Sequence, residues 1–120
     1  MAEAKLIYKI ISRSKWEQAE SEGVFDGAEI DIADGYIHFS TAEQAAETAA
    51  KHFAGQEDLL LVAVSVPALG QDLKWEESRG GALFPHLYGQ LKTSVEDGQV
   101  RSVHDLRLDE NGAHVFPEMR

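Results

Sequence analysis

The sequence predicts one α+β domain over residues 1–120, with a split, mainly antiparallel sheet and two helices. Three observations support this fold class. Residues 6–66 show strand, helix, strand, helix and strand patterns in that order. Several short strand patterns follow, without the continued strand–helix alternation that a doubly wound nucleotide fold requires. The sequence also contains no internal repeat, low-complexity tract or domain linker, and 120 residues suffice for a single core.

The composition narrows the classes of partner. The formal charge is −10, from 11 Lys and Arg residues against 21 Asp and Glu residues, and the basic residues are scattered, so we expect no binding to DNA. No apolar run reaches the roughly 20 residues that span a bilayer, so we expect no membrane association and a cytoplasmic location. The chain has no cysteine, which excludes disulfides and thiolate chemistry. A small anionic ligand held by local donors is compatible with this charge.

The first two expected elements are a strand and a short helix. LIYKIIS, residues 6–12, is rich in β-branched and aromatic residues and predicts a buried strand in the centre of a sheet. Residues 15–22 predict a helix with Ser14 as its N-cap, Glu17 completing an S-x-x-E capping box, and Gly23 at its end. The inward face of this helix is expected to contain Trp16 and Ala19.

A polar connection and a second short strand come next. VFDGAEIDIAD, residues 24–34, mixes acidic and apolar residues around one glycine and is predicted to be an exposed connection. Residues 36–39 predict a short strand with Tyr36 and His38 on one face, because successive strand side chains point to opposite faces.

Residues 42–53 show the clearest helical pattern. Ser40 or Thr41 can cap this helix, since S-x-x-E and T-x-x-Q both fit a capping box, and Gly55 is expected to end it. Its inward face is small, which favours close packing. The residues expected on that face are Ala42, Ala45, Ala46, Ala49, Ala50 and Phe53.

The rest of the chain predicts strands and loops. DLLLVAVSV, residues 58–66, is typical of a strand buried on both faces, and Pro67 stops it. Residues 70–98 predict loop and short strand. VRSVHDLRL and AHVF flank DENG, which has the composition of a hairpin turn with Gly112 providing a positive φ.

Two histidines are the main candidates for chemistry. Close metal-ligand spacing such as H-E-x-x-H does not occur, so no metal site is predicted. His38 and His86 are each set in a short apolar run beside a backbone-bending element. They either form facing walls of a pocket or are core residues bonded to backbone carbonyls, and the sequence leaves both open. Of the other three histidines, His52 is expected near a helix end, and His104 and His114 are expected on the surface.

Other polar residues have a functional or a structural interpretation. Glu76 is either a general base or ribose-hydroxyl acceptor in a cleft, or a solvent-facing strand residue. Tyr88 shares a face with His86 if FPHLYG is extended. Ser40 lies in no G-x-S-x-G nucleophile elbow, and a capping role explains its hydroxyl. The helix start beside His38 offers free N–H groups, which suit a phosphate or carboxylate.

Six segments, taken together and in order, resemble a bacterial family of small proteins, the domain-of-unknown-function family 952. These segments are YK, residues 16–19, GYIHFSTAEQ, DLLLVAV, WE and FPHLYG. The family is functionally uncharacterised and looks distantly similar to the ADP-ribosyltransferase-like superfamily, which includes RNA 2'-phosphotransferases. The resemblance implies an ADP-ribosyltransferase-like fold with a cleft for NAD or an ADP-ribose-like ligand. RNA itself is not an expected substrate for so acidic a chain.

The resemblance also implies roles for individual residues. The first-strand motif of the superfamily falls on Tyr8 and Lys9, where Lys9 departs from the usual histidine. His38 and Ser40 resemble a His-x-Ser motif, and Glu76 is the candidate for the catalytic glutamate. The predicted catalytic residues are therefore His38 and Glu76. The predicted ligand-binding residues are Lys9, Ser40, Thr41, Trp75, His86 and Tyr88.

Three classes of function follow. The first is a nucleotide-dependent enzyme related to ADP-ribosyl or phosphoryl transfer, with the ligand's phosphates at the N-terminus of the helix of residues 42–53. The second is a binding module for a small ligand that performs no turnover. The third is a structural or partner-binding domain in which His38 and His86 belong to the core.

Overall fold

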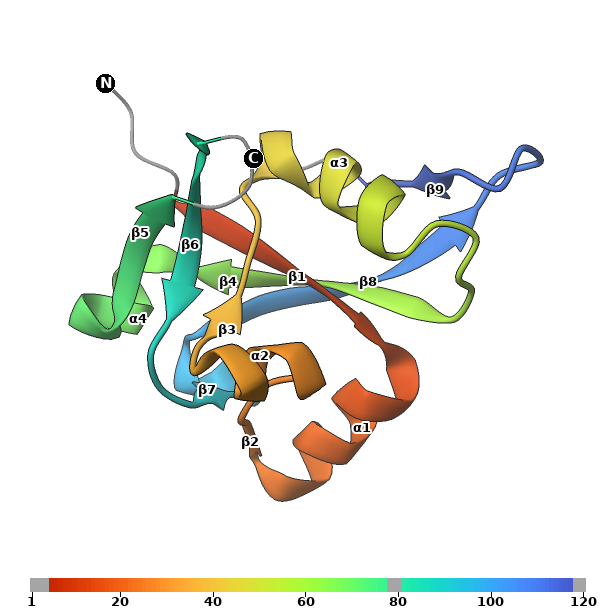
Figure 1. The fold of residues 1–120 in the computed structure, drawn as a ribbon. Coiled ribbons are helices and arrows are strands. Elements are labelled where there is room, and N and C mark those ends of the chain that lie inside the picture. Colours follow the sequence, from red (N-terminus) through yellow and green to blue (C-terminus); the bar gives the residue numbers. More distant parts are fainter. Residues whose placement is uncertain (1–4, 78–80, 118–120) are drawn as a thin grey trace.

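The computed structural model describes residues 5–77 and 81–117 and contains three antiparallel sheets (Figure 1). The largest has the order β1-β4-β8-β9, and a second has the order β3-β6-β5. The third pairs β2 with β7. In chain order the strands are β1 (Leu6–Ser12), β2 (Val24–Phe25), β3 (Ile37–His38), β4 (Leu59–Ser65), β5 (Leu73–Glu77), β6 (Leu83–Leu87), β7 (Leu91–Lys92), β8 (Val100–Leu108) and β9 (His114–Val115).

Four α-helices lie in the described part of the chain, together with two short 3-10 helices. The α+β class and the mainly antiparallel pairing are confirmed, whereas the predicted number of two helices is wrong. None of the helices among these residues is long and apolar enough to cross a membrane. The helices are α1 (Arg13–Glu22), α2 (Glu29–Asp34), α3 (Ala42–His52) and α4 (Val66–Leu69), and the 3-10 helices are η1 (Gly70–Asp72) and η3 (Val95–Asp97).

The largest sheet is covered on both faces, and this accounts for the continuous apolar sequence of β4. Figure 1 shows α3 on one side of this sheet and α1 with α2 on the other. On the α3 side the core includes Tyr8, Ile10, Ala49, Leu59, Leu61 and Leu106. On the α1 side it includes Ile7, Ile11, Trp16, Phe25, Leu60, Val62 and Val64.

A single bridge joins β1 to the segment after β3. The backbone N–H of Tyr8 donates to the carbonyl of Ser40 at 2.7 Å, and the N–H of Ser40 donates back to the carbonyl of Tyr8 at 2.9 Å. Beyond this point the two backbones separate. β1 is therefore an edge strand of its sheet, and the prediction that it lies centrally is wrong. An edge strand can still be buried, because helices cover both faces of the sheet and the segment after β3 bridges its free edge at Tyr8.

Several predicted elements are confirmed with corrected ends. The predicted strands at 6–12 and 58–66 and the β8–β9 hairpin are present, and Gly112 has a φ of +82°. Helix α1 begins directly after β1, so Ser12 is its N-cap and accepts from the N–H of Lys15 at 3.4 Å; the prediction of Ser14 is wrong. Thr41, not Ser40, caps α3, and it forms a reciprocal capping box with Gln44.

Two further predictions are corrected for reasons of packing. Residues 24–34 are exposed at most of their acidic positions, as predicted, but they are not a simple connection: they contain β2 and α2, and Asp31 is only 1% exposed. In α3 only part of the predicted alanine face is buried, since Ala45 and Ala49 face the sheet while Ala46 and Ala50 are exposed. Helix α3 contacts mainly β1, and contact with one strand buries a narrower stripe than contact with a full sheet.

Candidate functional site

A pocket of about 660 Å³ lies where β1 separates from the segment after β3. This volume falls within the range of about 300–1,000 Å³ that is usual for small-molecule sites. Its walls come from segments far apart in sequence. They are residues 8–10 of β1, residues 28–31 and 34 in and before α2, residues 36 and 38–40, residues 48, 52 and 53 at α3, residues 84 and 86 of β6, and Lys15.

A buried ion pair forms the inner wall of the pocket. Nζ of Lys9 lies 2.9 Å from Oδ2 and 3.2 Å from Oδ1 of Asp31, and both residues are buried. Asp31 sits at the third position of α2, and its Oδ2 accepts the backbone N–H of Ala28 at 2.7 Å, which satisfies an N-terminal donor of the helix. The buried ion pair of Lys9 and Asp31 thus connects the short helix α2 to β1.

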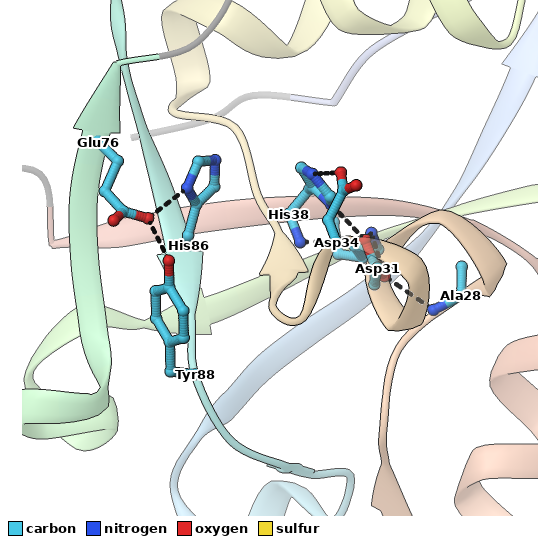
Figure 2. A network of polar contacts seen from close by, with 8 residues as sticks. Ala28, Asp31, Asp34, His38, Glu76, His86 and Tyr88 are labelled. Carbon is cyan, nitrogen blue, oxygen red and sulfur yellow. Dashed lines mark hydrogen bonds and ion pairs between the residues drawn. The ribbon is translucent and has the colours of Figure 1, made fainter.

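The chain of charges continues from Asp31 through His38 to Asp34 (Figure 2). Oδ1 of Asp31 lies 2.6 Å from Nδ1 of His38 and also accepts the backbone N–H of His38 at 3.1 Å. Nε2 of His38 lies 3.0 Å from Oδ2 of Asp34. Both ring nitrogens therefore face carboxylate oxygens. The contact with Asp34 is an ion pair only when the imidazole is protonated.

The surroundings of the buried pair act on its pKa values in opposite directions. Burial raises the pKa of Asp31, but the hydrogen bond from His38, the charge of Lys9 and the N–H of Ala28 together lower it from 3.8 to about 2. Desolvation by burial lowers the pKa of Lys9, and the charge of Asp31 opposes that change. Asp31 is therefore an ionised carboxylate at neutral pH, held by donors on every side.

A second imidazole stands next to His38 and has its own carboxylate. β3 and β6 pair antiparallel with His38 opposite His86. Nδ1 of His86 lies 2.8 Å from Oε1 of Glu76, and the hydroxyl of Tyr88 donates to the same oxygen at 2.8 Å. Hydrogen bonds from His86 and Tyr88 lower the pKa of Glu76, and the bond to Glu76 raises the pKa of Tyr88 to about 12. Figure 2 shows the second ring nitrogen of His86 pointing away from Glu76.

Tyr36 connects the two histidine–carboxylate pairs. Its ring stacks on His86 with centroids 4.1 Å apart, and it contacts His38 at 4.8 Å and Tyr88 at 5.1 Å. The rings of His38 and His86 meet edge to face at 5.3 Å. Offset and edge-to-face contacts of this kind restrict the rotation of each ring. Both imidazoles are thus fixed by a carboxylate and by neighbouring rings.

Four of the predicted site residues line the pocket, namely Lys9, His38, Ser40 and His86. The two histidines are neighbours on adjacent strands, so the prediction that they form facing walls is wrong. Lys9 is committed to Asp31, and the Ser40 hydroxyl lies 2.8 Å from the hydroxyl of Thr48.

The other four predicted residues lie outside the pocket lining. The carboxylate of Glu76 contacts both the imidazole of His86 and the hydroxyl of Tyr88. Thr41 is occupied in the capping box of α3, so the start of that helix is already satisfied by its own side chains. Trp75 is adjacent to Glu76 on β5 and therefore points to the opposite face of the strand, where it is 38% exposed.

Three residues of the site were missed by the sequence analysis: Asp31, Asp34 and Tyr36. Asp31 and Asp34 look like solvated acids because they occur in an acidic segment. One available signal in the sequence was the pair of glycines at 27 and 35, because glycine commonly stands at the ends of helices. In the structure these glycines bracket α2, and both have positive φ. Among residues 5–77 and 81–117, no His, Asp and Glu side chains form a group of three or more that could hold a metal ion.

Comparisons with known proteins identify relatives without an assigned activity. A family model described as "Protein of unknown function (DUF952)" matches residues 10–97. The crystal structure of protein CC0527 from Caulobacter crescentus is 53% identical, covers 92% of this chain and 93% of its own, and superimposes with a TM-score of 0.85. The solution NMR structure of CC0527 is 54% identical, covers 90% of each chain and has a TM-score of 0.79. No functionally curated protein matches the chain.

Proposed function

Because the chain belongs to the DUF952 family, whose function is unknown, we propose a function from the chemistry of the pocket. The pocket binds a small nucleotide of the NAD or ADP-ribose class. His38 and His86 contact the ribose or phosphate oxygens of that ligand. The observation that carries the proposal is the pair of adjacent imidazoles beside the pocket, each fixed by its own carboxylate.

The pocket has the two kinds of surface that a nucleotide requires. Phe39, Phe53 and Phe84 contribute to its lining and suit the flat face of a base. The opposite part contains His86, whose Nε2 can supply an N–H group to an oxygen, and the pair of His38 and Asp34, whose carboxylate can accept from a hydroxyl. Small-molecule sites typically combine a mainly apolar wall with a few placed polar groups, and this pocket has that character.

The fold is compatible with the proposed kinship to the ADP-ribosyltransferase-like superfamily. Two antiparallel sheets joined at one bridge, with a pocket where they separate, correspond to the split-sheet arrangement expected of such a protein. His38 and Ser40 directly precede α3, as in the His-x-Ser pattern on which the resemblance was based. We include this kinship in the proposal as support for a nucleotide ligand.

The roles of the acidic residues follow from their contacts. Glu76 binds His86 and Tyr88 rather than lining the pocket, so we assign it the role of a positioning residue for His86. Asp31 has the same role for His38. A carboxylate on Nδ1 fixes the ring and its tautomer, so that Nε2 of His86 is directed at the ligand and Nε2 of His38 at Asp34. The groups proposed to touch the ligand are therefore the imidazoles.

A second candidate function is a binding module that performs no turnover. The observation in its favour is that Lys9 and Glu76 are both occupied by protein partners. Neither is available to stabilise charge on a reacting ribose. Measurement of free nicotinamide after incubation with NAD separates the two functions. A transferase or hydrolase releases nicotinamide at a rate proportional to enzyme concentration, whereas a binding module releases none.

Calorimetric titration with NAD and with ADP-ribose tests the proposal. We expect saturable binding to the unmodified protein, and a loss of affinity of about tenfold or more in His38→Gln and His86→Gln. His86→Gln removes a hydrogen bond to the ligand, and His38→Gln removes the ring that orients Asp34 in the pocket. His104→Gln is the control, since His104 is exposed on β8 and outside the pocket. Amide NMR spectra establish that each variant is folded. Absence of heat and of chemical-shift change at millimolar nucleotide overturns the proposal.

A further inference from the structure

We infer that Asp34 recognises the free 2'- and 3'-hydroxyls of a ribose and rejects a ligand phosphorylated at that position. The inference rests on the proposed function, and it adds a specificity-determining residue to it. Asp34 lies at the end of α2 and lines the pocket. It is the outermost member of a chain of contacts that links Lys9, Asp31, His38 and Asp34.

This chain runs from the core to the surface. The side chains of Lys9 and Asp31 are only 9% and 0% exposed, whereas those of His38 and Asp34 are 30% and 45% exposed. Each buried member has an opposite charge or a donor beside it, as burial requires. The last member is a carboxylate in the pocket that His38 holds through Oδ2 only. Among residues 5–77 and 81–117, no hydrogen bond or ion pair occupies its other oxygen, which can accept from a ligand.

The charges around Asp34 disfavour an additional phosphate. The two lysines that line the pocket each lie beside a carboxylate: Lys9 beside Asp31 at 2.9 Å, and Lys15 beside Glu29 at 3.9 Å. His38 is placed between Asp31 and Asp34. A phosphate near Asp34 would therefore meet a carboxylate, while the buried lysine of the pocket, Lys9, is already paired with Asp31 and the exposed Lys15 has its own carboxylate neighbour. Like charges at short range in a partly buried site repel strongly.

Vicinal hydroxyls fit the same position. A carboxylate accepts from both hydroxyls of a ribose, and dinucleotide-binding proteins use an acidic residue in this way to recognise an unphosphorylated ribose. The contact with Nε2 of His38 orients Asp34 so that its other oxygen keeps one direction. The structure thus assigns a preference for NAD-type over NADP-type ligands to one residue.

Competition between matched ligands tests the inference. We expect the unmodified protein to bind ADP-ribose at least about tenfold more tightly than 2'-phospho-ADP-ribose, and Asp34→Asn to reduce this ratio to near one, because the amide no longer repels the phosphate. Asp97→Asn is the control, since Asp97 is an exposed acid in η3 outside the pocket. It should keep the ratio of the unmodified protein.

A second measurement does not depend on a variant. The ligand 2'-deoxy-ADP-ribose lacks one of the hydroxyls that Asp34 is proposed to accept from. It should bind the unmodified protein about tenfold more weakly than ADP-ribose, because the Asp34 carboxylate is then left without that donor. Equal affinity for all three ligands overturns the role of Asp34 and leaves the proposed function intact. An unchanged preference in Asp34→Asn does the same. Absence of binding by any of the three overturns the proposed function, and the role of Asp34 with it.

Discussion

Among single residues, Asp31 has the largest number of roles. It is the counter-ion of a buried lysine, the acceptor for an N-terminal amide of α2, and the group that fixes His38. None of these partners can be replaced by water, because Asp31 is 1% exposed and Lys9 is 7% exposed. Changes at Asp31 should therefore affect both stability and the orientation of His38.

The first prediction concerns this ion pair. Asp31→Asn removes the counter-charge of Lys9 and should destabilise the protein by about 3–5 kcal/mol, the usual result of leaving one buried charge unpaired. In a Lys9→Met background the same change should cost at least about 1 kcal/mol less, since no buried cation then remains. Urea unfolding of the four proteins in this double-mutant cycle gives the coupling energy. Strict additivity would show that the pair is not energetically coupled.

The second prediction concerns acid. The pKa of Asp31 is lowered in the folded state from 3.8 to about 2, so the unfolded chain binds this proton more readily. The resulting stability is present above pH 3.8 and is lost as the pH falls towards 2, by about 2 kcal/mol in all. Carbon-13 NMR of the Asp31 carboxyl should give a midpoint near 2. A midpoint at or above the ordinary value contradicts the contacts assigned to this group.

Sequence analysis identified the histidines but not their carboxylates, for a physical reason. An imidazole in an apolar run is conspicuous, whereas an aspartate in an acidic segment is not. Asp31 is buried only because Lys9, 22 residues earlier, and the backbone of His38 supply donors to it. Contacts of this kind depend on the tertiary structure and leave no local pattern.

At the scale of elements, α2 is the part that places the site. Its six residues include Ile30 and Ile32, which are 60% and 65% exposed, so it has no apolar stripe facing inward. The helix is held instead by the polar contacts of Asp31. This explains why hydrophobic periodicity predicted a connection rather than a helix.

The third prediction tests how closely α2 approaches the preceding loop. Gly27 has a φ of +124°, and a Cβ at this position would lie 2.8 Å from Cβ of Asp31. Gly27→Ala should therefore displace α2 and shift the ring resonances of His38. Gly98→Ala is the control, because Gly98 also has a positive φ of +87° but no atom within 4 Å of the added Cβ. It should lose about 1–2 kcal/mol from backbone strain and leave His38 unchanged.

The fourth prediction separates two candidate caps. The Thr41 hydroxyl accepts the backbone N–H of Gln44, and the backbone N–H of Thr41 donates to Oε1 of Gln44. Thr41→Ala removes the first of these bonds and should destabilise the protein by about 1 kcal/mol. Ser14 is exposed and lies inside α1, so Ser14→Ala should change stability by less than about 0.5 kcal/mol. Thermal unfolding of the two variants side by side distinguishes them. Equal losses would contradict the assigned helix starts.

For the whole molecule, the sequence predicted the class and most strands but not the arrangement around the pocket. Apolar runs such as residues 59–65 predict buried strands because burial on two faces requires them. The edge position of β1 was not predictable, since covering by α2 and α3 gives an edge strand the composition of a central one. The pocket exists because β1 meets the other sheet at one bridge only.

The central claim is that His38 and His86 contact a nucleotide in this pocket. Long-range nitrogen-15 NMR of the imidazole rings during titration with ADP-ribose tests it most directly, because the five histidines report separately. We predict saturable shifts of the His38 and His86 ring nitrogens, with His104 and His114 unchanged as internal controls. Ring nitrogens of His38 and His86 that keep their positions at millimolar ADP-ribose would contradict the claim.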